Sequence, residues 1–149
     1  MYKPRLVTKD DENTIYNLIN ELEDKPLSFP DFTKAFHLNL KDPSIVYYVM
    51  LDKDKIIGFI SIHIQILLHH VSKIAEIQEL IVAKEYQGKG IGTKLFDIAL
   101  KVAQDNNCTQ IEVCCNQKRQ RSHEFYLKVG MENSHYKFCL PIDKDKRYV

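Results

Sequence analysis

A short glycine-rich segment, residues 85–95, constrains the fold of this chain more than any other stretch. Three of the five glycines in the whole chain, Gly88, Gly90 and Gly92, alternate within it. An apolar strand pattern over residues 77–83 comes immediately before the segment. Immediately after it, apolar residues recur at the i, i+4, i+7 and i+8 spacing of one buried helix face. These residues are Ile91, Leu95, Ile98, Ala99, Val102 and Ala103. The glycines therefore lie where a strand turns into a helix.

Glycines at a strand-to-helix turn favour the binding of an anion. Without a Cβ, the backbone N–H groups of the turn can approach a ligand closely. The N-terminus of the helix adds unpaired N–H donors and partial positive charge, and Lys89 and Lys94 add formal charge nearby. We therefore predict a phosphate-binding loop, although a glycine-rich turn without a ligand remains an alternative. The predicted ligand-binding residues of the loop are Gln87, Gly88, Lys89, Gly90, Ile91, Gly92 and Thr93.

The class of phosphate ligand follows from the spacing within this loop. No Gly-Lys-Ser/Thr follows at the spacing of a Walker A loop. The loop also lies past the middle of the chain, whereas a dinucleotide fingerprint belongs to the first βα turn of its domain. The spacing Gln87-x-x-Gly90-x-Gly92 instead resembles the pyrophosphate loop of the GCN5-related N-acetyltransferases, the GNAT superfamily. This resemblance implies acetyl-CoA as the cofactor.

Length and composition restrict the remaining classes of protein. A chain of 149 residues predicts a single domain, 1–149. The net charge of +1 gives no bulk attraction to nucleic acid or to a membrane surface. No signal-peptide pattern opens the chain, and no apolar run reaches the ~20 residues that span a bilayer. Four cysteines without a CxxC spacing, Cys108, Cys114, Cys115 and Cys139, favour reduced thiols. We predict a cytoplasmic protein.

The order of predicted elements is β-α-α-β-β-β-α-β-α-β. It indicates an α/β fold of the mixed α+β type, a central twisted mixed sheet of about six to seven strands flanked by about four helices. The predicted strands are 5–7, 45–51, 56–68, 73–83, 111–115 and 136–140, and the predicted helices are 8–22, 31–40, 91–106 and 119–129. This order is similar to that of the GNAT fold, over nearly the whole chain.

The strand over residues 74–83 has an unusual composition for a central strand. It carries Glu76, Gln78 and Glu79, although such a strand is normally apolar on both faces. A buried carboxylate is costly unless it is paired or used as a general base. In several members of the resembling family, a glutamate eleven residues before the Gln or Arg of the loop is the base, and here that residue is Glu76. Glu79 is a second candidate, and a salt bridge or an edge position is the alternative reading of both.

A second motif follows the strand predicted at 111–115. Asn116, a helix that carries Phe125-Tyr126, and then Gly130 resemble the second GNAT signature. The resemblance implies that Asn116 binds the pantetheine arm of the cofactor and that Tyr126 is the general acid. It also implies that backbone groups of Leu80, Ile81 and Val82 bind the thioester and pantetheine. The alternative for Tyr126 is a purely structural role, in which its ring packs on the inner face of a helix.

A third stretch narrows the resemblance to one subfamily. The His-rich residues 62–71, followed by the sequence EIQEL at 76–80, are similar to the aminoalkylphosphonate N-acetyltransferases. Imidazoles and guanidinium groups could bind a phosphonate. The predicted substrate-binding residues are His63, Glu79, Arg119, Arg121, His123 and His135. A solvated turn is the better reading of His69-His70. A divalent metal held by His and Glu is conceivable, but no metal ligand is predicted.

The sequence therefore predicts an acetyl-CoA-dependent N-acetyltransferase that acts on the primary amine of a small molecule, such as an aminoalkylphosphonate. Glu76 would be the general base and Tyr126 the general acid. Two alternatives stay open. One is a GNAT enzyme for a polyamine, an amino acid or a protein N-terminus, and the other is a non-catalytic CoA-binding sensor. A homodimer is an expectation that rests only on the sheet edges that the late strands would leave.

Overall fold

The computed structural model describes residues 1–148. Contacts divide the chain into two compact units, Met1–Val113 and the part from Cys114 onward. The single domain over 1–149 stays a prediction.

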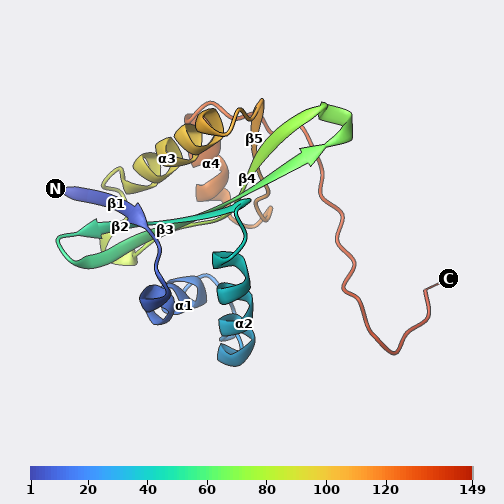
Figure 1. The fold of residues 1–149 in the computed structure, drawn as a ribbon, viewed down its shortest axis with the longest axis horizontal. Coiled ribbons are helices and arrows are strands. Elements are labelled where there is room, and N and C mark those ends of the chain that lie inside the picture. Colours follow the sequence, from blue (N-terminus) through green and yellow to red (C-terminus); the bar gives the residue numbers. More distant parts are fainter. Residues whose placement is uncertain (149) are drawn as a thin grey trace. The chain divides into compact units, whose positions relative to one another are not determined.

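The first unit contains a five-stranded mixed sheet in the order β1-β2-β3-β4-β5. The strands are β1 Tyr2–Leu6, β2 Ile45–Asp52, β3 Lys55–Leu67, β4 Ser72–Val82 and β5 Gln110–Val113. Strands β1 to β4 form antiparallel neighbours, and β5 runs parallel to β4 (Figure 1). The mixed sheet confirms the predicted α+β class, and the antiparallel strands followed by a parallel crossover confirm the predicted order of strands.

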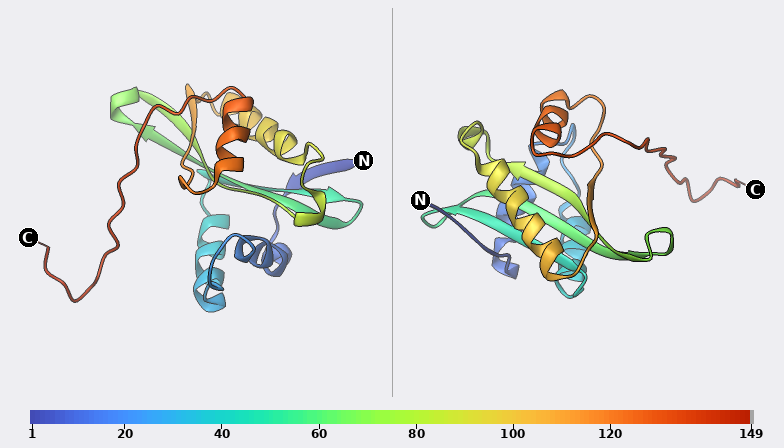
Figure 2. Two further views of the ribbon diagram at one scale, coloured as in Figure 1. Left: turned by 180° about the vertical axis from the view of Figure 1, so that it is seen from behind. Right: turned by 90° about the horizontal axis from the view of Figure 1, so that it is seen from above.

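Helices cover both faces of this sheet. Helices α1 (Glu12–Asn20) and α2 (Phe29–Leu40) lie on one face, and α3 (Ile91–Asp105) lies on the other (Figure 2). Short 3₁₀ turns precede or join these elements at Lys9–Asp11, Leu68–His70 and Lys84–Tyr86. The second unit contains α4 (Gln120–Lys128), which ends just before Gly130 at a φ of 102°. A left-handed glycine is a common helix terminator, as the sequence predicted here.

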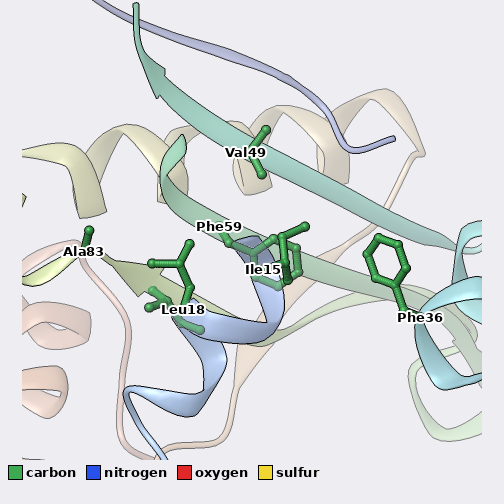
Figure 3. Packing of buried hydrophobic residues seen from close by; sticks show 7 residues of the cluster. Ile15, Leu18, Phe36, Val49, Phe59 and Ala83 are labelled. Atoms are coloured by element: carbon green, nitrogen blue, oxygen red, sulfur yellow. The ribbon is translucent and has the colours of Figure 1, made fainter. Parts of the chain in front are cut away.

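Apolar side chains fill the space between the sheet and each helix layer. Beneath α1 and α2, a cluster of core residues joins both helices to β2, β3 and β4 (Figure 3). The cluster consists of Ile15, Leu18, Phe36, Val49, Phe59, Ile81 and Ala83. On the other face, α3 buries Ile91, Leu95, Phe96, Ala99, Val102 and Ala103. The predicted face of α3 is therefore confirmed, except that Ile98 is only half-buried and Phe96 joins the face.

A β-bulge interrupts the pairing of β3 with β4. Ser61 pairs with Glu79, but the next residue of β3, Ile62, pairs with Ile77, so Gln78 is an extra residue in β4. Side chains alternate between the two faces of a regular strand. Residues 76 and 79 would therefore lie on opposite faces, and the extra residue brings both to the same face.

The structure corrects the predicted number of strands. Among residues 1–148 there are five strands rather than six to seven, and residues 136–140 do not form a strand. The side chains of Tyr136 and Phe138 in this segment are 86% and 94% exposed. Alternating apolar residues suit a strand, but a strand also needs a neighbour for its backbone N–H and C=O groups. Residues 136–140 pair with no strand of the described chain, which is why the pattern alone misled. The other predicted elements are present, with their ends shifted by a few residues.

Candidate functional site

Two carboxylates of β4 share the face of the sheet that α1 and α2 cover. Glu79 pairs across to Ser61, which lies two residues after the core residue Phe59 on β3, and Glu76 pairs with His63, two residues further on. Both carboxylates are half-buried. The side-chain amide of Gln78 donates to Glu76. The structure thus brings together three predicted residues of the first unit, Glu76, Glu79 and His63.

Each carboxylate has polar neighbours that the sequence did not reveal. Ser61 Oγ donates to the Glu79 carboxylate and accepts the Glu79 backbone N–H at 2.9 Å. Glu112 of β5 lies opposite Glu76 in the parallel register. Tyr47 of β2 pairs with Ser61, so Tyr47, Ser61 and Glu79 form one row across three strands. The sequence did contain a signal for Ser61. It lies two residues before His63 and four before Gln65, so the three side chains share one face of the strand.

The pKa of the Tyr47 phenol is raised by its surroundings in this row. Burial raises the pKa of its phenol, a hydrogen bond from Asn39 Nδ2 to the phenol oxygen at 2.6 Å lowers it, and the negative charge of Glu79 raises it again. The Glu79 carboxylate therefore acts on groups of the α1 and α2 face of the sheet.

Beyond the bulge, β4 has an open edge within the first unit. Strand β5 pairs only with Ile74 to Ile77, so residues 78–82 have no strand on that side in the described chain. The N–H groups of Glu79 and Ala83 donate toward β3, to Ser61 Oγ and to the Ile57 carbonyl. Because N–H directions alternate along a strand, those of Leu80 and Val82 point to the open edge.

The predicted phosphate loop directly follows this open edge. Gly88 and Gly90 have φ angles of 78° and 81°, in the left-handed region that favours glycine. A Cβ would meet no atom within 4 Å at either position, so backbone conformation rather than crowding requires glycine. Gly90 is the N-cap of α3 and makes no side-chain cap, so it leaves the first-turn N–H groups to a ligand. Gln87 Nε2 donates to the Val82 carbonyl at 3.2 Å, which ties the loop to β4.

Two lysines lie against aromatic rings beside the loop. Lys89 Nζ is 5.1 Å from the centroid of the Tyr86 ring, and Lys94 Nζ is 5.7 Å from that of Tyr2. Such cation–π contacts hold the charges without neutralising them. Backbone donors, a helix N-terminus and two cations together fit a pyrophosphate.

The second unit holds the other predicted residues. The Asn116 side-chain oxygen accepts the Lys118 N–H at 2.9 Å, and the Asn116 carbonyl lies 2.8 Å from His123 Nε2. Arg119 is the N-cap residue of α4, and Arg121 lies in its first turn and is exposed. His135 is exposed, and its ring bonds to Ser134. The structure therefore brings Asn116 and His123 together.

Tyr126 lies on α4 and is half-buried. The pKa of its phenol is raised to about 12, chiefly by burial, with Cys115 adding to the rise and Arg119 opposing it. The phenol consequently keeps its proton at neutral pH, as a proton donor must.

Residues 1–148 were also compared with the requirements of a metal site and of a membrane-spanning helix. No three His, Cys, Asp or Glu side chains there lie close enough to bind a metal ion. No helix in that range combines the length and the apolar character needed to cross a membrane. Cys108, Cys115 and Cys139 form no disulfide bond within that range.

Comparison with known proteins identifies the family to which this chain is similar. The model of the acetyltransferase (GNAT) family matches residues 12–131. An aminoalkylphosphonate N-acetyltransferase of Salmonella typhimurium is 37% identical over 90% of this chain and 87% of its own. A glucosamine 6-phosphate N-acetyltransferase of Candida albicans is 31% identical over 72% of each chain. The crystal structure of a transcriptional regulator from Bacillus halodurans C-125 superposes with a TM-score of 0.86 at 22% identity, covering 95% of this chain and 100% of that one, which shows a common fold.

Proposed function

Because the chain belongs to the acetyltransferase (GNAT) family, and is an acetyl-CoA-dependent N-acetyltransferase, we propose that it acetylates the primary amine of a small molecule carrying a phosphonate or phosphate group. The observation that carries the proposal is the bulge at Gln78, which gives one face of the sheet two carboxylates beside the open edge of β4. An amine must bind as a cation and then lose a proton before it can attack a thioester, and carboxylates serve both needs.

The names of two relatives support the phosphorus group of the acceptor. One acts on aminoalkylphosphonates and the other on glucosamine 6-phosphate, so both acceptors combine an amine with a phosphorus oxyanion. Guanidinium groups bind such oxyanions through paired hydrogen bonds. Arg119 and Arg121, with His123 and His135, would supply this binding, and His63, which pairs with Glu76 across the sheet, would contact the amine.

Residues of the first unit, together with Asn116 of the second, are proposed to bind acetyl-CoA. When bound, acetyl-CoA supplies an acetyl group activated as a thioester. The loop from Gln87 to Thr93 would hold its pyrophosphate, and Asn116 would bind its pantetheine amides. The N–H groups of Leu80 and Val82 would donate to the pantetheine and to the carbonyl oxygen of the acetyl group, and Ile81 between them packs in the core.

Protons would move through two residues. Glu76 would accept the proton of the amine at a carboxylate oxygen, directly or through one water. Tyr126 would hold the proton that the departing thiolate takes, at its phenol oxygen. No acetylated side chain is required, so none of the four cysteines needs to act as a nucleophile.

Replacement of Gly90 by valine should raise the KM for acetyl-CoA by about tenfold or more, because a β-branched residue in the left-handed region costs on the order of 1–3 kcal/mol and distorts the loop. Steady-state kinetics with a fixed acceptor measures this change. Asn107→Val is the matched control, because it places valine at a φ of 58° beyond the other end of α3. An equal rise of KM in both variants would contradict a role of the loop in binding.

The acceptor is identified by acetyl-CoA turnover, measured by thiol release, on a panel of amines. The panel compares aminomethylphosphonate, 2-aminoethylphosphonate and glucosamine 6-phosphate with spermidine, several amino acids and a peptide, each with and without divalent metal. We expect the highest kcat/KM for the amines that carry phosphorus. Turnover on other amines alone would leave an acetyltransferase with a different substrate. Tight binding of CoA without any turnover would point to a sensor module.

A further inference from the structure

Ser61 is a buried polar residue in the middle of the sheet that no step described so far requires. Asp11 and Ser61 are the buried polar or charged residues among residues 1–148. Burial of Asp11 is explained by its ion pair with Arg5 at 2.7 Å. Ser61 is 0% exposed and lies among apolar neighbours on β3. A buried hydroxyl is costly unless its hydrogen bonds are satisfied, so its partners indicate its role.

Both hydrogen bonds of Ser61 go to a single residue, Glu79. Its Oγ accepts the Glu79 backbone N–H at 2.9 Å and donates its proton to the Glu79 carboxylate oxygen Oε1. In a regular ladder that N–H would bond a backbone carbonyl, so at the bulge the hydroxyl takes the place of a ladder acceptor. One side chain therefore fixes both the backbone and the carboxylate of Glu79.

The second carboxylate oxygen of Glu79 has no hydrogen-bonded partner among residues 1–148. Tyr47 lies on the opposite side of Ser61 in the same row. The negative charge of Glu79 contributes to the raised pKa of the Tyr47 phenol. An anion that is held at one oxygen and left open at the other suits a cationic ligand better than a structural salt bridge.

We propose that Ser61 is a positioning residue, which holds the Glu79 carboxylate so that its open oxygen binds the ammonium group of the acceptor. The inference rests on the proposed function and divides the work between the two carboxylates. Glu79 binds the cation of the incoming amine, and Glu76 removes its proton. Ser61 itself touches neither substrate.

Kinetics of Ser61→Ala tests this role. The KM for the amine should rise about tenfold, the order expected for loss of a charge-assisted contact, while kcat and the KM for acetyl-CoA change less than about twofold. Ser61→Thr, which keeps the hydroxyl, should restore the KM for the amine. Ser72→Ala is the matched control, since Ser72 lies on β4 but bonds the His70 carbonyl at 3.0 Å.

A double-mutant cycle separates positioning from a merely structural role. If Ser61 acts through Glu79, Ser61→Ala adds little to the rise of KM already caused by Glu79→Gln. Additive effects, or a loss of kcat with an unchanged KM for the amine, would overturn the proposal. Circular dichroism of each variant verifies that the sheet is intact.

Binding measurements keep this test separate from that of the function. If the wild-type protein turns over no amine of the panel, the proposed function fails, and calorimetry with 2-aminoethylphosphonate in the presence of CoA replaces kinetics. About tenfold weaker binding to Ser61→Ala than to the wild type would support the positioning role. Equal binding to both, or no binding to either, would refute it.

Discussion

Glu76→Gln is expected to lower kcat at neutral pH about 100-fold or more, the usual range for loss of a general base. The amide has the same shape as the carboxylate but cannot accept the proton of the amine. As the pH rises, a larger fraction of the amine in solution is already deprotonated, so the variant should recover part of its activity. A profile of kcat and kcat/KM against pH, with the preferred amine of the panel, measures both effects.

Two further glutamates provide the controls for Glu76→Gln. Glu79→Gln should act chiefly on the KM for the amine, because Glu79 is assigned to binding rather than to proton removal. Glu21→Gln, the same substitution at an exposed residue at the end of α1, should change neither parameter. An activity loss in Glu76→Gln that is equal at every pH would argue for a structural role, and full activity would exclude Glu76 as the base.

Tyr126→Phe is expected to lower kcat about 100-fold as well, because the departing thiolate loses its proton donor. The pKa of the Tyr126 phenol is raised to about 12, so its deprotonation is displaced above the range of an ordinary tyrosine. An ordinary tyrosine is half ionised near pH 10. Because the pKa of Tyr126 is higher, the wild-type rate should not fall through ionisation of Tyr126 up to roughly pH 10. The variant should be slower throughout that range.

The measurement for Tyr126→Phe is a pH profile of kcat beside that of Tyr136→Phe. Tyr136 is 86% exposed and outside any helix or strand, so its substitution should leave the rate unchanged. Equal rates for Tyr126→Phe and the wild type at every pH would remove the general-acid role from Tyr126.

Local patterns in the sequence were sufficient for most of the fold. The apolar spacing of α3 and the glycines before it predicted a strand, a loop and a helix, because each signal lies within a few residues of the element it forms. Gly90 and Gly130 both have positive φ angles, at the start of α3 and the end of α4, where the sequence predicted helix boundaries.

The bulge could not be predicted in the same way. Strict alternation places Glu76 and Glu79 on opposite faces of β4, and only the pairing of Ser61 with Glu79 and of Ile62 with Ile77 reveals the extra residue. Pairing is a property of two strands distant in sequence, so no pattern within β4 carries it. Sequence reasoning named both carboxylates from the composition of the strand and the spacing to the loop. It missed that they share a face, and it missed Ser61 beside Glu79.

The absence of a strand at 136–140 has a related cause. Its alternation of apolar residues is as regular as that of other strands, but alternation describes only the side chains. Whether a backbone is paired depends on the strand beside it, and residues 136–140 have none in the part of the chain that the structure describes. The predicted number of strands was therefore too high, because the pattern of side chains in residues 136–140 does not show whether another strand lies beside them.

If the loop binds acetyl-CoA as proposed, the glycine at the start of α3 makes the stability of the enzyme depend on its own acetyl donor. Serine, threonine, aspartate or asparagine at the N-cap would satisfy an N–H group of the first turn, and Gly90 cannot. Bound acetyl-CoA would supply that missing cap, in front of a helix that buries six side chains against the sheet. By mass action, each tenfold rise of acetyl-CoA above its Kd adds about 1.4 kcal/mol to the free energy of unfolding. The fraction of the enzyme that survives heat or proteolysis would then increase with the concentration of acetyl-CoA around it.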